Sequence, residues 1–238
     1  MQGIAAANRV AAIDWASTAT ALDARGWAIL PRLLSAGECH RIAARYDAVE
    51  GFRSHVKMAR HGFGRGEYKY FSYPLPDLVQ DLRTTLFPPL AKMANAWNER
   101  MGIDIRFPRL LAEFLESCHQ AGQRHPTPLL LKYGPGDYNC LHQDLYGEHV
   151  FPLQVATLLS APGVDFEGGE FILTEQRPRM QSRVEVVPLT QGDAVVFAVN
   201  HRPVQGTRGV YRVALRHGVS TLRGGHRATL GIIFHDAK

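Results

Sequence analysis

The second half of the chain alternates short apolar stretches with turn residues. From residue 128 onward, glycine- and proline-rich turns separate apolar stretches that have the length of strands. The predicted strands cover residues 129–133, 150–160, 170–173, 183–189, 194–199, 211–220 and 228–235. Many short strands joined by such turns predict a β-sandwich or a barrel.

Helical patterns dominate the first half. They cover residues 17–25, about 35–49, 78–101 and 109–119, with a short apolar strand at 26–31. Ser35, followed three residues later by Glu38, is a capping-box pattern that opens the second helix. Inside the long third helix, Pro88 and Pro89 predict a break or a restart.

These patterns predict one structural domain with two parts. Residues 1–127 form a mixed, mostly helical part that packs outside the barrel, and residues 128–238 form a β-rich core. The sequence shows neither an internal repeat nor a clear linker.

Composition excludes several classes of protein. The chain has 238 residues, of which 45% are hydrophobic, so a packed core is expected and disorder is not. It has no apolar run long enough for a membrane helix and no secretory pattern at its start, so we expect a cytoplasmic protein without a membrane partner. Three distant cysteines fit neither a disulfide framework nor a zinc site.

The positive charge is local. The net charge is +5, with 22 Arg and 5 Lys, yet residues 177–227 alone carry nine Arg against two acidic residues. This segment therefore has a net charge of +7, and the rest of the chain sums to −2. A local basic face fits an anionic ligand or partner, but solvated strand edges explain it equally well.

The sharpest chemical feature is His142-Gln143-Asp144. We expect it to open a strand, where residues i and i+2 share a face, so His142 and Asp144 both point into the barrel. One imidazole and one carboxylate on one face make two-thirds of the 2-His-1-carboxylate triad that holds non-haem Fe(II) and leaves positions open for substrate and O2. A satisfied structural histidine is the alternative reading.

A second histidine must come from a distant strand. The downstream candidates are His149, His201, His217, His226 and His235. We favour His217, because it lies late in an apolar run and ten residues before Arg227. Arg227, with the Thr229 hydroxyl, is suited to bind the carboxylate of a dicarboxylate co-substrate. The second choice, His201 with Arg212, is weaker because Arg202-Pro203 interrupts the run after His201.

The register limits this assignment. A two-residue hairpin at Gly224-Gly225 would turn Arg227 away from the face of His217. We therefore predict that residues 221–226 form an irregular loop.

The order of these motifs resembles the Fe(II)- and 2-oxoglutarate-dependent oxygenase superfamily. The resemblance covers residues 128–236, and nearly the full length is similar to a bacterial family of oxygenases labelled as acting on damaged nucleic acid. The motifs that carry it are Tyr133-x-Pro135-Gly136-x5-His142-x-Asp144, Phe166-Glu167-Gly168-Gly169-Glu170, Gly192-Asp193 and His217-x9-Arg227.

The resemblance implies a fold, cofactors and roles. The fold would be a double-stranded β-helix, a cupin-like jelly roll, with helices packed outside. His142, Asp144 and His217 would bind Fe(II), while Arg227, Thr229 and Tyr133 would bind 2-oxoglutarate. The enzyme would use O2 to hydroxylate or oxidatively demethylate a substrate, with conversion of 2-oxoglutarate to succinate and CO2.

The resemblance leaves the substrate open. The motifs around His142 are close to those of AlkB-type nucleic-acid demethylases, but Leu131 replaces the usual Asn and Ile233 replaces a second Arg. The spacing from His217 to Arg227 and the Gly-Gly-Glu turn are more similar to prolyl-hydroxylase-type enzymes, which usually have Lys at that position. Methylated or damaged nucleic acid, a protein side chain and a small metabolite all remain candidates, as does a metal-binding module without activity.

Two basic segments are candidates for contact with nucleic acid. Residues 52–73 interleave basic and aromatic side chains, which suits phosphate contact and base stacking, and residues 177–183 form a basic loop. The alternative for the first segment is a glycine-containing lid over a small-molecule site. The weaker substrate candidates are Tyr146, His149, Arg177 and Arg179.

Overall fold

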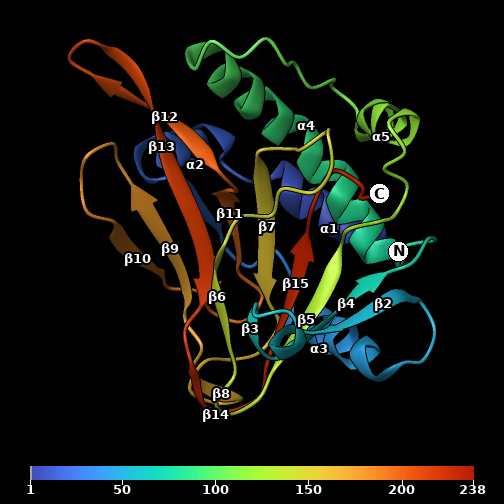
Figure 1. Cartoon of the computed structure of the whole chain (residues 1–238). Coiled ribbons are helices and arrows are strands. Elements are labelled where there is room, and N and C mark those ends of the chain that lie inside the picture. The colour runs from blue at the N-terminus through green and yellow to red at the C-terminus, as the bar shows by residue number, and fades with distance from the viewer. Residues whose placement is uncertain (1) are drawn as a thin grey trace.

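The computed structural model describes residues 2–238, with side chains from Ala6 onward. Its strands form two main antiparallel sheets and one short pair (Figure 1). In spatial order, the larger sheet contains β1 (Trp27–Leu30), β11 (Ala194–Ala198), β7 (Leu153–Leu158), β15 (Arg227–Ile232), β5 (Leu129–Tyr133), β4 (Glu67–Phe71) and β2 (Phe52–Lys57). The smaller sheet contains β10 (Arg183–Val187), β9 (Phe171–Gln176), β13 (Gly209–Val219), β6 (Tyr138–His142) and β3 (Gly64–Arg65), with β12 (His201–Gly206) paired to β13. The short pair joins β8 (Phe166–Gly168) to β14 (Leu222–Gly225). These sheets confirm the predicted jelly roll.

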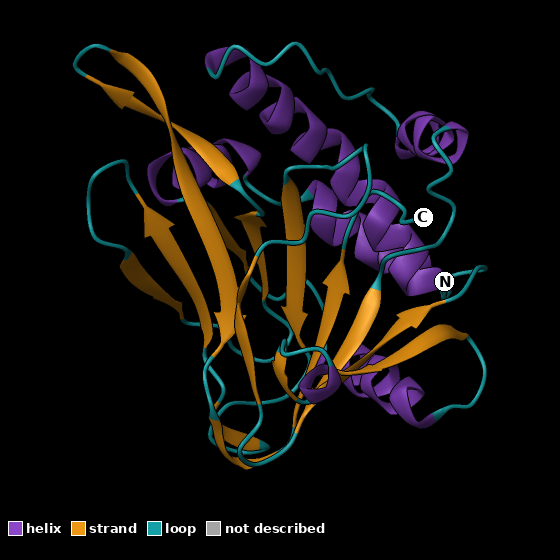
Figure 2. Ribbon diagram, viewed as in Figure 1, coloured by secondary structure: helices purple, strands orange, loops and turns teal. Residues whose placement is uncertain are grey.

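The helices cover the outer side of the larger sheet (Figure 2). They are α1 (Gln2–Ala11), α2 (Trp15–Arg25), α3 (Ala36–Ala44), α4 (Asp77–Arg100) and α5 (Leu111–Gln120), with 3-10 turns η1 (Arg45–Asp47) and η2 (Met58–Arg60). In the main apolar core, Leu86 and Leu90 of α4 belong to the same cluster as Leu130 of β5 and Leu230 of β15. In the part of the chain that the structure describes, no helix has the length and apolar character needed to span a membrane.

Strand β15 shows how this core positions the interior. Ala228, Leu230 and Ile232 belong to the core that the helices cover, whereas Arg227, Thr229 and Gly231 line a cavity between the two sheets. This alternation is the period of two that a strand imposes on its side chains. One strand therefore serves both the core and the interior cavity.

The capping box is present, although the helix is shorter than predicted. The Ser35 hydroxyl accepts a hydrogen bond from the backbone N–H of Glu38, and the Glu38 carboxylate accepts one from the backbone N–H of Ser35. The helix ends at Ala44 and a 3-10 turn follows, instead of a helix running to about residue 49.

Replacing Ser35 with alanine is expected to lower the free energy of unfolding by about 1 kcal/mol, because the cap of α3 is lost. Urea denaturation followed by circular dichroism measures this change. Ser17→Ala, at an exposed position inside α2, is the control and should stay within about 0.5 kcal/mol of the wild type. An equal effect of both substitutions would contradict the capping role.

The predicted break at Pro88-Pro89 is wrong. Helix α4 runs without interruption from Asp77 to Arg100 with both prolines inside it. Leu82 and Leu86 before the prolines and Leu90 after them are buried in the same apolar core. Packing on both sides thus outweighs the cost of the two missing backbone donors.

The segment 52–73 is not a glycine-rich lid but part of the framework. Strands β2 and β4 pair with each other, and β4 pairs with β5, so the segment extends the larger sheet. The short strand β3 joins the smaller sheet beside β6. The segment therefore bridges the two sheets at one side of the interior cavity.

Candidate functional site

Two histidines and an aspartate meet at the inner side of the smaller sheet. His142 ends β6 and lies directly opposite His217 of β13 in the ladder, with ring centroids 4.2 Å apart. One carboxylate oxygen of Asp144 lies 3.4 Å from Nε2 of His142, and the other lies 3.4 Å from Nε2 of His217. One ligand atom from each residue falls within 4.8 Å of the other two. The fold thus brings together the three residues selected from the sequence.

The prediction that His-x-Asp opens a strand is wrong, because β6 ends at His142 and Asp144 lies in the following loop. The next ladder position on β13 is already occupied. The side-chain amide of Gln143 donates to the carbonyl of Leu215, and the N–H of Leu215 donates to the carbonyl of Asn200. Asp144 still faces the cavity, but a loop and not a strand holds it there.

The ring of His142 is oriented by its own strand. Its Nδ1 lies 2.8 Å from the carbonyl oxygen of Cys140, which can only accept, so Nδ1 carries the proton. Nε2 is then the nitrogen that faces Asp144 and is free to bind a metal. Burial disfavours the charged ring, but the hydrogen bond and charge of Asp144 outweigh it and raise the pKa of His142.

The other two residues of the cluster, His217 and Asp144, differ in charge: the imidazole is neutral and the carboxylate is negative. Burial lowers the pKa of His217, which packs against the rings of Phe197 and Phe171, so this imidazole is neutral. Burial alone would raise the pKa of Asp144, but hydrogen bonds from His142 and His217 hold it well below its usual range. A neutral imidazole and a carboxylate are the ligand forms that a divalent metal requires.

This donor set fits Fe(II). Two imidazole nitrogens and one carboxylate meet on one side, and the other side opens onto the cavity, as in a facial triad. The Tyr146 hydroxyl donates a 2.7 Å hydrogen bond to Asp144, which supplies the outer hydrogen bond that ligating carboxylates commonly receive.

The cavity has a volume of about 360 Å³ and lies between the sheets. Strands β5, β7 and β15 form one wall, and β6, β9 and β13 form the other. Within residues 2–238, its charged or ionisable lining consists of the three clustered residues, Arg227, tyrosines and Cys140. The cavity is therefore largely apolar, and the three clustered residues and Arg227 are among its few ionisable groups.

Arg227 lies at the end of the cavity wall formed by β5 and β15. It is 2% exposed, its Nη1 donates a 2.7 Å hydrogen bond to the Thr229 hydroxyl, and its guanidinium carbon lies 5.6 Å from the ring centroid of Tyr133. Tyr133 is its direct partner in the β5–β15 ladder. Among the described residues, the Nε of Arg227 has no hydrogen-bond partner. Burial raises the pKa of Tyr133, so its hydroxyl stays protonated and keeps a donor for a carboxylate, and burial lowers the pKa of Arg227.

The connection between His217 and Arg227 differs from the predicted irregular loop. Residues 222–225 form β14, which pairs with β8 with a register shift, so no hairpin joins β13 to β15. The chain instead crosses from the smaller sheet to the larger one. This crossing removes the register conflict, and His217 and Arg227 both line the cavity.

The weaker substrate candidates divide into two groups. Tyr146 lines the cavity, whereas His149, Arg177 and Arg179 do not. Arg177 forms a 2.7 Å ion pair with Glu175, and Arg179 is exposed in the β9–β10 loop. The second-choice histidine, His201, lies in edge strand β12, which continues through Pro203, and does not join the cluster.

Sequence reasoning missed part of the cavity wall. It assigned Tyr68 and Tyr70 to a basic segment for nucleic acid, but both side chains line the cavity beside Asp144, and Phe63 joins them. The signal was their i, i+2 spacing, which puts them on one face of β4.

Comparison with known proteins agrees with this geometry. A family model for oxygenases described as catalysing oxidative methylation of damaged DNA matches residues 66–237. An uncharacterised protein of Mycobacterium tuberculosis is 49% identical over 167 residues, which cover 70% of this chain and 72% of that protein.

Solved structures show the same fold at low identity. A Pseudomonas putida prolyl-4-hydroxylase has a TM-score of 0.53 at 15% identity, covering 94% of this chain and 99% of that chain. A 2-oxoglutarate-Fe(II) oxygenase family protein from Burkholderia pseudomallei has a TM-score of 0.53 at 18% identity, covering 95% of this chain and 94% of that chain. Both likenesses support the double-stranded β-helix.

Proposed function

This chain belongs to the Oxygenase-NA family of the Fe(II)- and 2-oxoglutarate-dependent oxygenases, and from that premise we propose that it oxidises methylated or damaged bases in nucleic acid. The enzymes of this superfamily use Fe(II) as cofactor and 2-oxoglutarate and O2 as co-substrates. The observation that carries the proposal concerns one segment, residues 52–73. Its aromatic side chains form part of the cavity lining, and its basic side chains are presented to solvent.

His142, Asp144 and His217 would hold the iron, because they are the one cluster of metal-ligating side chains found within the described residues. Bound Fe(II) supplies the oxidising chemistry that couples decarboxylation of 2-oxoglutarate to oxidation of a C–H bond. The ring of His142 is oriented by the Cys140 carbonyl, and Asp144 is oriented by Tyr146.

Arg227, Thr229 and Tyr133 would bind the distal carboxylate of 2-oxoglutarate. The guanidinium offers paired donors, the Thr229 hydroxyl holds it in place, and the Tyr133 hydroxyl adds a neutral donor. All three are buried, so an ion pair between Arg227 and the co-substrate would be less screened than one at the surface.

The substrate end of the cavity favours a planar, uncharged or cationic group. Phe63, Tyr68, Tyr70 and Tyr146 line it, and their rings offer stacking surfaces and phenol hydroxyls without a negative charge. Outside the cavity, Lys57, Arg60 and Arg65 of the same segment are exposed and suited to contact phosphates. The basic β9–β10 loop, residues 177–183, is a second candidate for such contacts.

Substrate-stimulated turnover tests the proposal. The protein is loaded with Fe(II) anaerobically, and succinate is measured after addition of 2-oxoglutarate and O2 with methylated oligonucleotides, unmodified oligonucleotides or peptide pools. We expect stimulation by the methylated oligonucleotides and release of formaldehyde where an N-methyl group is hydroxylated. Stimulation by peptides alone would replace nucleic acid with a protein side chain as the substrate.

Binding of single-stranded DNA by the double variant Arg60→Gln/Arg65→Gln is expected to depend less on salt. Each lost phosphate contact lowers the slope of log Kd against log salt concentration by roughly 0.7. Fluorescence anisotropy at several salt concentrations measures the slope. Arg109→Gln, an exposed arginine outside both basic segments, is the control and should leave the slope unchanged. Equal slopes for the wild type and the double variant would exclude this segment from phosphate contact.

A further inference from the structure

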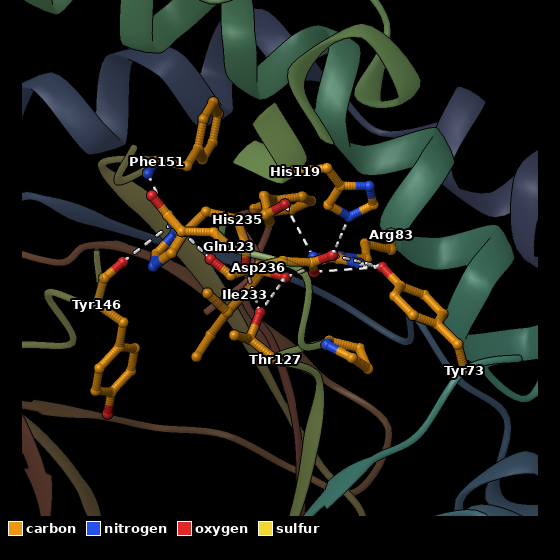
Figure 3. Close-up of polar contacts among 12 residues, drawn as sticks. Tyr73, Arg83, His119, Gln123, Thr127, Tyr146, Phe151, Ile233, His235 and Asp236 are labelled. Atoms are coloured by element: carbon orange, nitrogen blue, oxygen red, sulfur yellow. Dashed lines mark hydrogen bonds and ion pairs between the residues drawn. The ribbon is translucent and has the colours of Figure 1, made fainter. Parts of the chain in front are cut away.

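The loop that carries Asp144 is held by a buried glutamine, Gln123, which the sequence did not distinguish (Figure 3). Its Oε1 accepts hydrogen bonds from the backbone N–H groups of Glu148 and His149, at 2.9 and 2.8 Å. Its Nε2 donates to the carbonyls of Asp236, His149 and Tyr146, at 2.6, 3.1 and 3.4 Å. The donors and acceptors around it fix which end of the amide is oxygen.

The amide of Gln123 leaves no room for a side chain at position 147 of the loop. Gly147 has a φ of +83°, and a Cβ atom there would lie 2.4 Å from the side-chain amide carbon of Gln123. Gln123 thus packs directly on the one residue of the loop that can both adopt this backbone conformation and admit the amide.

The other side of Gln123 is anchored in a rigid network. The Asp236 carboxylate, fully buried, receives hydrogen bonds from Arg83 at 2.8 Å, Tyr73 at 2.9 Å and His119 at 2.8 Å (Figure 3). Arg83 also donates to backbone carbonyls of the segment that follows β15. The glutamine therefore links helices α4 and α5, through the C-terminal segment, to the loop of Asp144.

We propose that Gln123 is a positioning residue for the metal site. It fixes the backbone of Tyr146, and the Tyr146 hydroxyl donates the 2.7 Å hydrogen bond that orients the Asp144 carboxylate. Outer partners of metal ligands of this kind change metal affinity by about 10–100-fold when they are lost. This inference rests on the proposed metal site. Gln123 would act on that site through Tyr146 and Asp144, without itself contacting the metal.

Metal affinity measured with Co(II) alone tests this inference. The Kd from calorimetry and the visible absorption bands of bound Co(II) are recorded for the wild type, Gln123→Met and Gln123→Glu. We expect Kd to rise about 10-fold or more in both variants, with altered bands. In Gln123→Met the new side chain has a similar length but cannot form these hydrogen bonds. In Gln123→Glu a carboxylate oxygen replaces the NH2 group and faces the three carbonyl oxygens that this group contacts. Two variants are used so that the test remains possible if one of them fails to fold.

A matched control separates positioning from stability. Asn98 is a buried amide that donates 2.9 Å to the Ile105 carbonyl, away from the cavity lining. Asn98→Leu should lower the melting temperature without changing the Co(II) Kd. A Gln123→Met protein that loses stability like Asn98→Leu but keeps its Kd within twofold would overturn the proposal.

The route through Tyr146 is tested by a double-mutant cycle. Tyr146→Phe should weaken Co(II) binding, and adding Gln123→Met should weaken it little further, because both changes remove the same support of Asp144. Fully additive effects would refute this route. Absence of Co(II) binding by the wild type, or its persistence in His142→Ala, would overturn the metal site itself, an outcome distinct from a failure of Gln123 alone.

Discussion

Replacing His217 with alanine is expected to abolish both metal binding and formation of succinate from 2-oxoglutarate. His217 supplies one of three ligands, and the remaining pair, His142 and Asp144, belongs to a single short segment that cannot enclose a metal alone. The neutral ring of His217 lies buried against Phe171 and Phe197. Among the described residues, the cluster contains no third histidine that could replace it as a ligand. Calorimetry with Co(II) and a succinate assay with Fe(II) measure the two losses.

The control for this substitution is a histidine that sequence reasoning ranked second. His201 lies in the neighbouring strand β12, faces Ala214 across the ladder and is outside the cluster. His201→Ala should retain metal and succinate formation close to the wild-type values. If His201→Ala loses metal while His217→Ala keeps it, the site has been assigned to the wrong strand.

Arg227→Met is expected to raise KM for 2-oxoglutarate by roughly 30-fold or more. Truncating one partner of a buried, hydrogen-bonded charge pair costs about 2–5 kcal/mol, and each 1.4 kcal/mol is a factor of ten. Initial rates of succinate formation over a range of 2-oxoglutarate concentrations measure this change. The affinity for Co(II) without co-substrate should stay the same, because Arg227 is outside the metal cluster.

Stability distinguishes this role from a structural one. Within residues 2–238, Arg227 forms no ion pair with a carboxylate, although its side chain is buried. A buried unpaired charge is costly, so Arg227→Met should keep or raise the melting temperature of the protein without co-substrate. Arg223→Met, whose side chain is 66% exposed, should leave KM unchanged. A fall in melting temperature with an unchanged KM would assign Arg227 to the framework.

The fold was predictable where local signals agree with the final packing. Seven strands after residue 128 follow from apolar runs between turns, whereas β6, β8, β12 and β14 contain no such run and were not predicted. The capping box of Ser35 and Glu38 is a contact between near neighbours. Strands β2 and β4 were missed, since charged residues interrupt their apolar pattern, and β4 is stabilised by pairing with the distant strand β5. The continuity of α4 through Pro88 and Pro89 likewise depends on distant core contacts.

The residues of the site were easier to predict from the sequence than the backbone conformation that holds them. The His-x-Asp motif and the spacing from His217 to Arg227 select residues that the fold brings to one cavity. The backbone around Asp144 was not predictable, because the side chain of Gln143 ends the ladder through a contact 72 residues away. Gln123 gave no signal at all, since a single glutamine in a polar connection has no pattern that distinguishes it.

The alternation along β15 has a consequence for engineering this enzyme. Positions 227, 229 and 231 line the cavity, and positions 228, 230 and 232 face the helices. If Arg227 and Thr229 bind 2-oxoglutarate as proposed, substitutions at the odd positions of this strand should change which acid the pocket accepts, and substitutions at the even positions should change the stability of the fold. A redesign of co-substrate preference can change the odd positions and leave the even ones untouched, so specificity and foldability are separable within six consecutive residues.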